Sequence, residues 1–206
     1  MKASHIVLGI LGVFLALFIM FALAIAGSYN GMNTGKNLAL TAWGNVENVY
    51  QRRLDLLPNL VATVQGAANF ESKVFTDVAT ARASVGQLKI DASNAPKTAA
   101  DMKAFQEAQG QLGNAMSRLM AVSENYPQLK ATDAFKELQA QIEGTENRIA
   151  VERRNYNLAV NTYDTQITAF PHVLWAGMFG FQSMPRFEAE AGANKAPKVS
   201  FSPFGK

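Results

Sequence analysis

The stretch RRLDLLPNLV, residues 52–61, decides the fold because it sets charges and a proline inside a long run with helical periodicity. The apolar residues of this run fall at spacings built from three and four, at Val46, Tyr50, Leu54, Leu57, Val61, Val64, Val74, Val78 and Val85. Such spacing is typical of an amphipathic helix, in which these residues form an apolar stripe along one face. Pro58 lacks an N–H group and clashes with the carbonyl four residues earlier, which costs a helix roughly 3 kcal/mol. Because the period continues past Pro58, we expect a helix kinked there, with Arg52, Arg53 and Asn59 able to satisfy the freed carbonyls.

Upstream of this helix, residues 6–26 form an almost uninterrupted apolar run without a charge. About 20 helical residues cross a hydrocarbon core of ~30 Å, so the run predicts a transmembrane anchor over residues 1–27. A secretory signal peptide is the alternative, since Ala24 and Ala26 before Gly27 resemble a small-residue cleavage site. The apolar part of a signal peptide is only about 7–15 residues long, so we expect a retained anchor.

Downstream, the same stripe pattern predicts three long helices, over about 36–88, 98–125 and 133–169. A linker over 28–35 precedes them, Pro127 marks a turn, and Thr132 or Asp133 can cap the last helix. No strand-like alternation persists. The fold class is therefore all-α: an N-terminal transmembrane helix followed by an antiparallel bundle over 36–181, with three or four long helices depending on Pro58. Residues 182–206 are rich in Pro, Gly, Ala, Ser and Lys and are expected to form an extended or disordered tail.

The composition argues against several classes of function. The chain has 206 residues and a formal net charge of +3, and its basic residues are scattered, whereas a nucleic-acid-binding domain clusters them on one face. Cysteine is absent, which removes thiol nucleophiles and thiolate metal sites. The two histidines, His5 and His172, stand near opposite ends of the chain, which disfavours a histidine metal site or a catalytic triad. We predict no cofactor, no metal and no nucleic-acid partner.

RRLDLLPNLV resembles the hallmark of the LemA family. The resemblance continues through SYNGM (28–32), GTENRIAVERRNYN (144–157), TAFPHVLWAGMFGF (168–181) and FEAE (187–190), in order and over almost the whole chain. It implies the helical fold, the anchor and a bacterial membrane, together with an association with membrane proteases and protein quality control. Family members in some bacteria carry a lipid-modified cysteine before the YN pair; Ser28 stands there, and serine offers no thioether.

The charges that flank the anchor specify its orientation weakly. Lys2 and the terminal amine precede the span, and the first basic residue after it is Lys36. The positive-inside rule then favours a cytoplasmic N-terminus and an exported domain. We predict a single-pass protein of the bacterial inner (cytoplasmic) membrane with a periplasmic domain; the resemblance also allows the opposite, cytoplasmic placement.

Charged residues fall on core-facing positions of two predicted helices. Glu152 lies on an apolar stripe four residues before Tyr156, and Arg53 lies on another three residues after Tyr50. A buried charge is costly unless it is paired, so we expect an inter-helix ionic network. Its candidate members are Arg52, Arg53, Asp55, Glu146, Glu152, Arg153 and Arg154. The network would fix the helix register or line a polar groove for a partner, and the neighbouring candidates are Pro58, Asn59, Asn147 and Arg148.

An enzyme would need more than these carboxylates. Asp55 with Glu146 or Glu152 could form an acid–base pair for hydrolysis. The sequence supplies neither a recognisable nucleophile motif nor a phosphate-binding glycine loop. We predict that the protein is not an enzyme.

Residues 170–181, FPHVLWAGMFGF, are almost continuously apolar and aromatic but too short to span a membrane. Three roles are open: a cap on the end of the bundle, a segment on the membrane surface, or a contact with another subunit. The interaction candidates here are Phe170, Pro171, Trp175, Phe179 and Phe181.

These features predict a membrane-anchored helical scaffold or adaptor. Its partners are expected to be other membrane proteins, a membrane protease among them, or further copies of the same chain as a homo-oligomer. The alternative is a ligand-sensing or peptide-binding module that uses the polar patch around Arg53, Pro58 and Glu152.

Overall fold

The computed structural model describes residues 2–65, 72–88 and 95–188, in which most residues are helical and no strand occurs. The helices in chain order are α1 (Lys2–Gln65), α2 (Ser72–Gln87), α3 (Ala99–Ser123), α4 (Pro127–Lys130), α5 (Asp133–Thr168) and α6 (Val173–Ala176). The predicted all-α class is confirmed.

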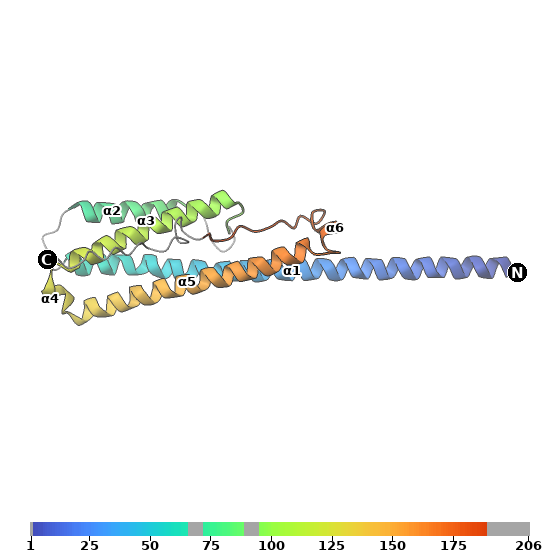
Figure 1. The fold of residues 1–206 in the computed structure, drawn as a ribbon, viewed down its shortest axis with the longest axis horizontal. Helices are drawn as coiled ribbons and strands as arrows, with labels where there is room; N and C mark the ends of the chain where they lie inside the picture. Colours follow the sequence, from blue (N-terminus) through green and yellow to red (C-terminus); the bar gives the residue numbers. More distant parts are fainter. Residues whose placement is uncertain (1, 66–71, 89–94, 189–206) are drawn as a thin grey trace, which may run out of the picture.

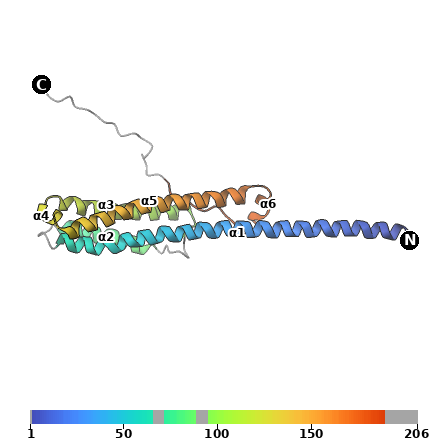
Figure 2. The ribbon, with the colours of Figure 1, turned by 90° about the horizontal axis from the view of Figure 1, so that it is seen from below.

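The four long helices α1, α2, α3 and α5 run alternately up and down, which confirms the antiparallel bundle (Figures 1 and 2). Helix α1 packs mainly along α5, and α2 packs along α3. The N-terminal part of α1 projects beyond the bundle as a single rod, and α6 lies beside α1 where the rod begins (Figure 1). This projecting part is long and apolar enough to cross a membrane, and residues 6–24 of it are exposed. We call residues 6–26 the apolar span.

Helix α1 is one helix of 64 residues that passes through both the expected linker and Pro58. The linker residues 28–35 are helical because they pack on α5: a Cβ added at Gly31 or Gly35 would lie 2.8 or 2.7 Å from the side chain of Gln166. Packing of this kind offsets the roughly 1 kcal/mol that each glycine costs a helix. The structure does not show the kink that we expect at Pro58.

The helical run expected over 36–88 is divided, and the division lies after Gln65 rather than at Pro58. The stripe residues on both sides of the division, such as Leu57, Val64, Val78 and Val85, enter the same core cluster. One straight helix could not bring them together. Folding back between α1 and α2 buries both halves of the stripe, so burial rather than proline sets where the helix ends.

Among the described residues, the core forms three clusters along the length of the bundle. The end far from the span is aliphatic and takes buried residues from α1, α2, α3 and α5. The middle is aromatic, with Trp43, Tyr50, Phe105 and Tyr156. The end next to the span contains Met32, Tyr163, Ile167, Trp175 and Phe181.

Helix α5 contains a glycine that contributes no visible packing. A Cβ added at Gly144 would meet no atom within 4 Å. The substitution Gly144→Ala is therefore expected to raise the free energy of unfolding by roughly 0.5–1 kcal/mol, because alanine loses less backbone freedom in a helix. Urea denaturation followed by circular dichroism measures the gain. Gly180, whose φ of 75° disfavours a side chain, is the matched control and should lose stability on the same change. Equal effects at the two positions would contradict this interpretation.

Candidate functional site

Arg53 is the one charged side chain among the described residues that the bundle buries, with 8% of its surface exposed. Its Nε donates to Glu146 Oε1 at 2.7 Å, and its Nη2 forms an ion pair with the same oxygen at 2.5 Å. Its Nη1 donates to the backbone carbonyl of Gln109 at 3.3 Å. Gly113 leaves room for the guanidinium, since a Cβ there would come within 3.0 Å of Nη2. Arg53 thus joins α1, α3 and α5 at one level.

Burial raises the pKa of the neighbouring Tyr50 hydroxyl, although the charges of Arg153 and Arg53 oppose that shift. The guanidinium carbon of Arg53 lies 5.9 Å from the centroid of the Tyr50 ring. Tyr50 therefore remains a neutral phenol beside the buried cation.

The other charged candidates do not join this pair. Asp55 accepts a hydrogen bond from Gln51 one turn earlier on α1, at 2.8 Å. Glu152 is half-buried and accepts from Asn155 on its own helix at 3.1 Å. The remaining candidates of the two charged motifs on α1 and α5 are exposed: Arg52, Pro58, Asn59, Asn147, Arg148 and Arg154. The structure thus brings together Arg53 and Glu146, and Arg153 takes part in a different contact.

Arg153 contacts the segment of residues 181–188, which runs back along the bundle from α6 without helix or strand (Figure 1). We call this segment the strap. Asn157 pairs with the backbone of Phe187 in both directions, its Nδ2 donating to the carbonyl and its Oδ1 accepting from the N–H, each at 2.9 Å. Gln106 does the same with Glu188, at 3.0 and 3.3 Å. The two amide side chains therefore make the hydrogen bonds to the strap's backbone N–H and C=O groups that a neighbouring β-strand would otherwise make.

Two tyrosines and an aspartate of α5 hold the rest of the strap. Tyr156 donates to the carbonyl of Pro185 at 2.9 Å, and Tyr163 donates to that of Gln182 at 3.0 Å. Burial raises the pKa of both hydroxyls, and the charge of Asp164 adds to the effect, so they remain donors. Asp164 accepts from the N–H of Met184 at 3.2 Å and pairs with Arg186 at 2.9 Å.

Phe187 fastens the strap to the aromatic core. It is buried, its ring stacks on Trp43 at 6.0 Å between centroids, and it meets Tyr156 edge-on at 5.6 Å. Arg153 covers the ring from outside, with its guanidinium carbon 4.8 Å from the centroid. Sequence reasoning missed this role of α5. A signal was present in the spacing: Tyr156 and Tyr163 are seven residues apart, as are Asn157 and Asp164, so these side chains share one face of the helix.

The apolar segment 170–180, which we call the hook, closes the bundle next to the apolar span. The indole N–H of Trp175 donates to Ser28 Oγ at 2.8 Å, and both residues are buried. The ring of Tyr29 meets Phe179 at 5.3 Å and Phe181, the first residue of the strap, at 5.5 Å. Pro171 is half-buried and Phe170 exposed. The hook therefore caps the bundle with one face and leaves other apolar side chains uncovered.

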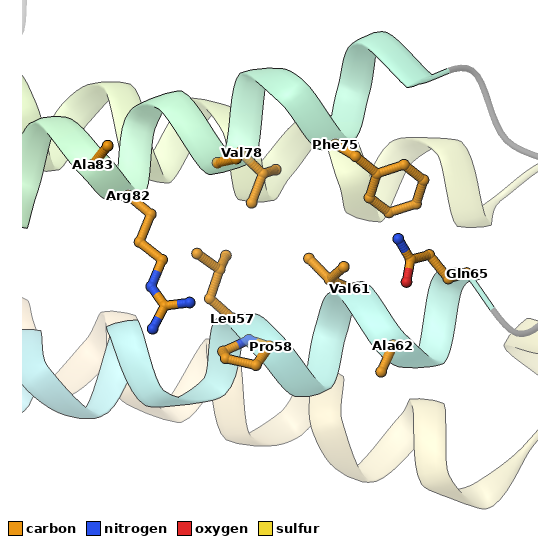
Figure 3. Close-up of a pocket in the computed structure, with 10 residues that line it drawn as sticks. Leu57, Pro58, Val61, Ala62, Gln65, Phe75, Val78, Arg82 and Ala83 are labelled. Carbon is orange, nitrogen blue, oxygen red and sulfur yellow. The ribbon is translucent and has the colours of Figure 1, made fainter.

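Pro58 lines an open groove of about 680 Å³ between α1 and α2 (Figure 3). Leu57 and Val61 face Phe75 and Val78 across it, with Arg82 at one end (Figure 3). The full lining is Leu57, Pro58, Val61, Ala62, Gln65, Phe75, Val78, Ala79, Arg82 and Ala83.

Arg53 and Glu146 line a different groove, of about 510 Å³, between α3 and α5. The polar patch proposed around Arg53, Pro58 and Glu152 is therefore not one site. Arg53 and Pro58 open to different grooves, and Glu152 lines neither.

Comparison with known proteins places the chain in a family. Residues 42–201 match the model of the LemA family. The chain is also 29% identical, over 197 residues, to the magnetosome protein MamQ 2 of Paramagnetospirillum magneticum, an alignment that covers 88% of this chain and 72% of the relative. MamQ of Magnetospirillum gryphiswaldense is 28% identical, with the same coverage of each chain. The protein LemA of Metamycoplasma hominis is 22% identical over 151 residues, or 73% of this chain and 64% of that one. Since the family model spans most of the bundle and the strap, the chain belongs to the LemA family.

Proposed function

We propose that the protein is a non-enzymatic adaptor that holds the groove between α1 and α2 at a fixed height above the membrane and binds a partner there. The observation that carries the proposal is the continuity of α1, which contributes both the apolar span and one wall of the groove. At about 1.5 Å per residue, Pro58 stands roughly 48 Å from Ala26 along the helix axis. An uninterrupted helix of this kind transmits position without a flexible joint.

The lining of the groove defines the chemistry of the partner. The walls are aliphatic and aromatic, and Val61 and Phe75 are only partly covered by the domain itself. Arg82 is exposed and makes no ion pair within the part of the chain that the structure describes. These features fit an amphipathic helix or apolar peptide that carries a carboxylate. The proposed partner is a membrane protein, such as a protease, or a second copy of this chain, on the periplasmic face of the inner membrane.

Photocrosslinking in native membranes tests this proposal. A benzophenone amino acid at Ala62 or Ala83, two exposed positions on the groove, should give an adduct of discrete mass with the full-length chain. Arg82→Glu should remove most of that adduct by repelling the partner's carboxylate. Ala140, exposed on α5 and outside both grooves, is the matched control and should give none.

The mass of the adduct distinguishes the two partners. An adduct of twice the chain mass means self-assembly, and any other discrete mass means a second protein. Equal labelling from Ala140, or no adduct from the groove, would overturn the proposal. An adduct that survives Arg82→Glu would contradict only the prediction that the partner carries a carboxylate, and not the binding of a partner in the groove.

A second function, ligand sensing, is favoured by the groove between α3 and α5. Its volume lies within the range of small-molecule sites, and Arg53, Lys130, Glu143 and Glu146 line it together with apolar residues. Absence of any adduct from the α1–α2 groove would direct attention to it.

A further inference from the structure

We propose that the hook is a second membrane contact, whose exposed side chains lie in the lipid headgroup and upper acyl region beside the apolar span. In this arrangement the bundle rests its end on the bilayer instead of standing free on a single helix. The proposal concerns lipid, and it is independent of what the α1–α2 groove binds.

The position of the hook along α1 is the first observation. The ring of Trp175 meets Phe21 edge-on, with centroids 6.4 Å apart, and its indole N–H bonds to Ser28. Phe179 meets Tyr29. The hook therefore lies level with residues 21–29 of α1, whereas the apolar span ends at Ala26. If the span is in lipid, Phe21 is in lipid, and the hook that touches it straddles the same boundary.

The exposed side chains of the hook are the second observation. Phe170 is 80% exposed, Leu174 62% and Met178 84%, and Val173 and Phe179 are exposed as well. Outside the apolar span, the described residues include nine large exposed apolar or aromatic side chains, and these five stand within ten residues of one another. Such a concentration marks an interaction surface rather than ordinary scatter. Trp175 and Ala176 are buried, so the hook has one face on the protein and one face open.

The charge pattern is the third observation. No Asp, Glu, Lys or Arg occurs in residues 3–35 or in residues 165–185. The two charge-free stretches are far apart in sequence, yet the fold brings them together at the same end of the bundle (Figure 2). A lipid environment accounts for the absence of charge from both stretches, because a charged side chain within the membrane is costly.

In this proposal lipid rather than a second protein covers the open face, since Trp175 contacts Phe21 of the span itself and Phe179 contacts Tyr29, three residues beyond the end of the span. Trp175 and Tyr29 sit at the level where aromatic side chains are enriched in membrane proteins. The hook resembles in chemistry an interfacial anchor that lies in the plane of the membrane, although it is shorter than an amphipathic helix.

Depth measurements on the full-length chain in vesicles of phosphatidylethanolamine and phosphatidylglycerol test the proposal. The chain has no cysteine, so Leu174→Cys or Met178→Cys places a single environment-sensitive NBD label in the hook. Leu158→Cys on α5 is the matched control, because Leu158 is 60% exposed and lies within the bundle. We expect both hook labels to be quenched by lipids spin-labelled high on the acyl chain and to be at least threefold less sensitive to aqueous iodide than the label at position 158.

Two results would overturn the proposal. Iodide quenching of both hook labels as strong as at position 158 would mean that the hook is in water. Protection from iodide together with no quenching by spin-labelled lipid would mean that protein, such as a second copy, covers the hook. Because the replaced side chains are exposed, circular dichroism should show an unchanged helix content, which separates either result from misfolding.

Discussion

Phe187→Ala is expected to lower the free energy of unfolding by about 3–4 kcal/mol and to release the strap from the bundle. The ring fills the space between Trp43, Phe105 and Tyr156, and truncating a buried phenylalanine to alanine typically costs about 3–5 kcal/mol, because the cavity closes only in part. The loss should fall toward the lower end of that range, since the backbone bonds from Asn157 and Gln106 remain possible. Urea denaturation of the full-length chain in detergent measures the loss.

Trypsin gives an independent readout of strap release. The bond after Arg186 lies within the strap, and the N–H of Phe187 is bonded to Asn157 in the folded protein. Cleavage there should be slow in the wild-type chain and clearly faster after Phe187→Ala. The control is Leu158→Ala on α5, which removes an exposed apolar side chain and should change neither stability by more than about 0.5 kcal/mol nor the cleavage rate. A strap that stays resistant in the Phe187 variant would show that hydrogen bonds alone hold it.

Glu146→Ala is expected to destabilise the bundle by about 2–3 kcal/mol, and more than Arg53→Met does. Removing the carboxylate leaves a buried guanidinium whose one remaining acceptor among the described residues is the carbonyl of Gln109. Breaking a fully buried ion pair costs about 3–5 kcal/mol, and the estimate is reduced here because the Glu146 side chain is 43% exposed. Removing Arg53 instead leaves a carboxylate that water can reach, and methionine fills much of the vacated volume.

The stability loss in Glu146→Ala should exceed that in Arg53→Met, and this order tests the role of the buried charge most directly. The double variant with both changes should recover part of the loss, since neither charge is then left alone. Glu143→Ala, three residues earlier on α5 and exposed, should be close to neutral. Urea denaturation of all four variants measures the series. If Arg53→Met proves more damaging than Glu146→Ala, then packing of the arginine stem and not its charge holds the three helices in register.

The parts of the fold that depend on local pattern could be predicted from the sequence. Stripes at spacings of three and four gave the long helices, and Thr132 caps α5 by accepting from the N–H of Phe135 at 3.3 Å. The expected kink at Pro58 is not shown, and α1 continues through that residue to Gln65. The helical run instead divides after Gln65, because the position of a turn depends on which residues can share a core, and that is a property of the folded chain.

The strap could not be predicted because its order comes from distant side chains. Its composition is that of a tail, and nothing local gives it secondary structure. The hydrogen bonds to its backbone come instead from the side chains of Asn157 on α5 and Gln106 on α3. The charged motifs likewise identified Arg53 and Glu146 as candidates, but not as a pair. Which acidic residue faces Arg53 depends on how α1 and α5 are aligned along their length, and sequence spacing does not encode that alignment.

Because α1 is unbroken, any tilt of the apolar span within a bilayer would tilt the whole bundle with it. Membrane helices lean on average by about 20°, and the lean increases when the hydrocarbon layer becomes thinner than the apolar stretch. With an arm of roughly 48 Å, such a lean moves the groove sideways by about 16 Å. If the groove binds a partner as proposed, membrane thickness would thereby change which membrane proteins it can reach, without any change in the groove itself.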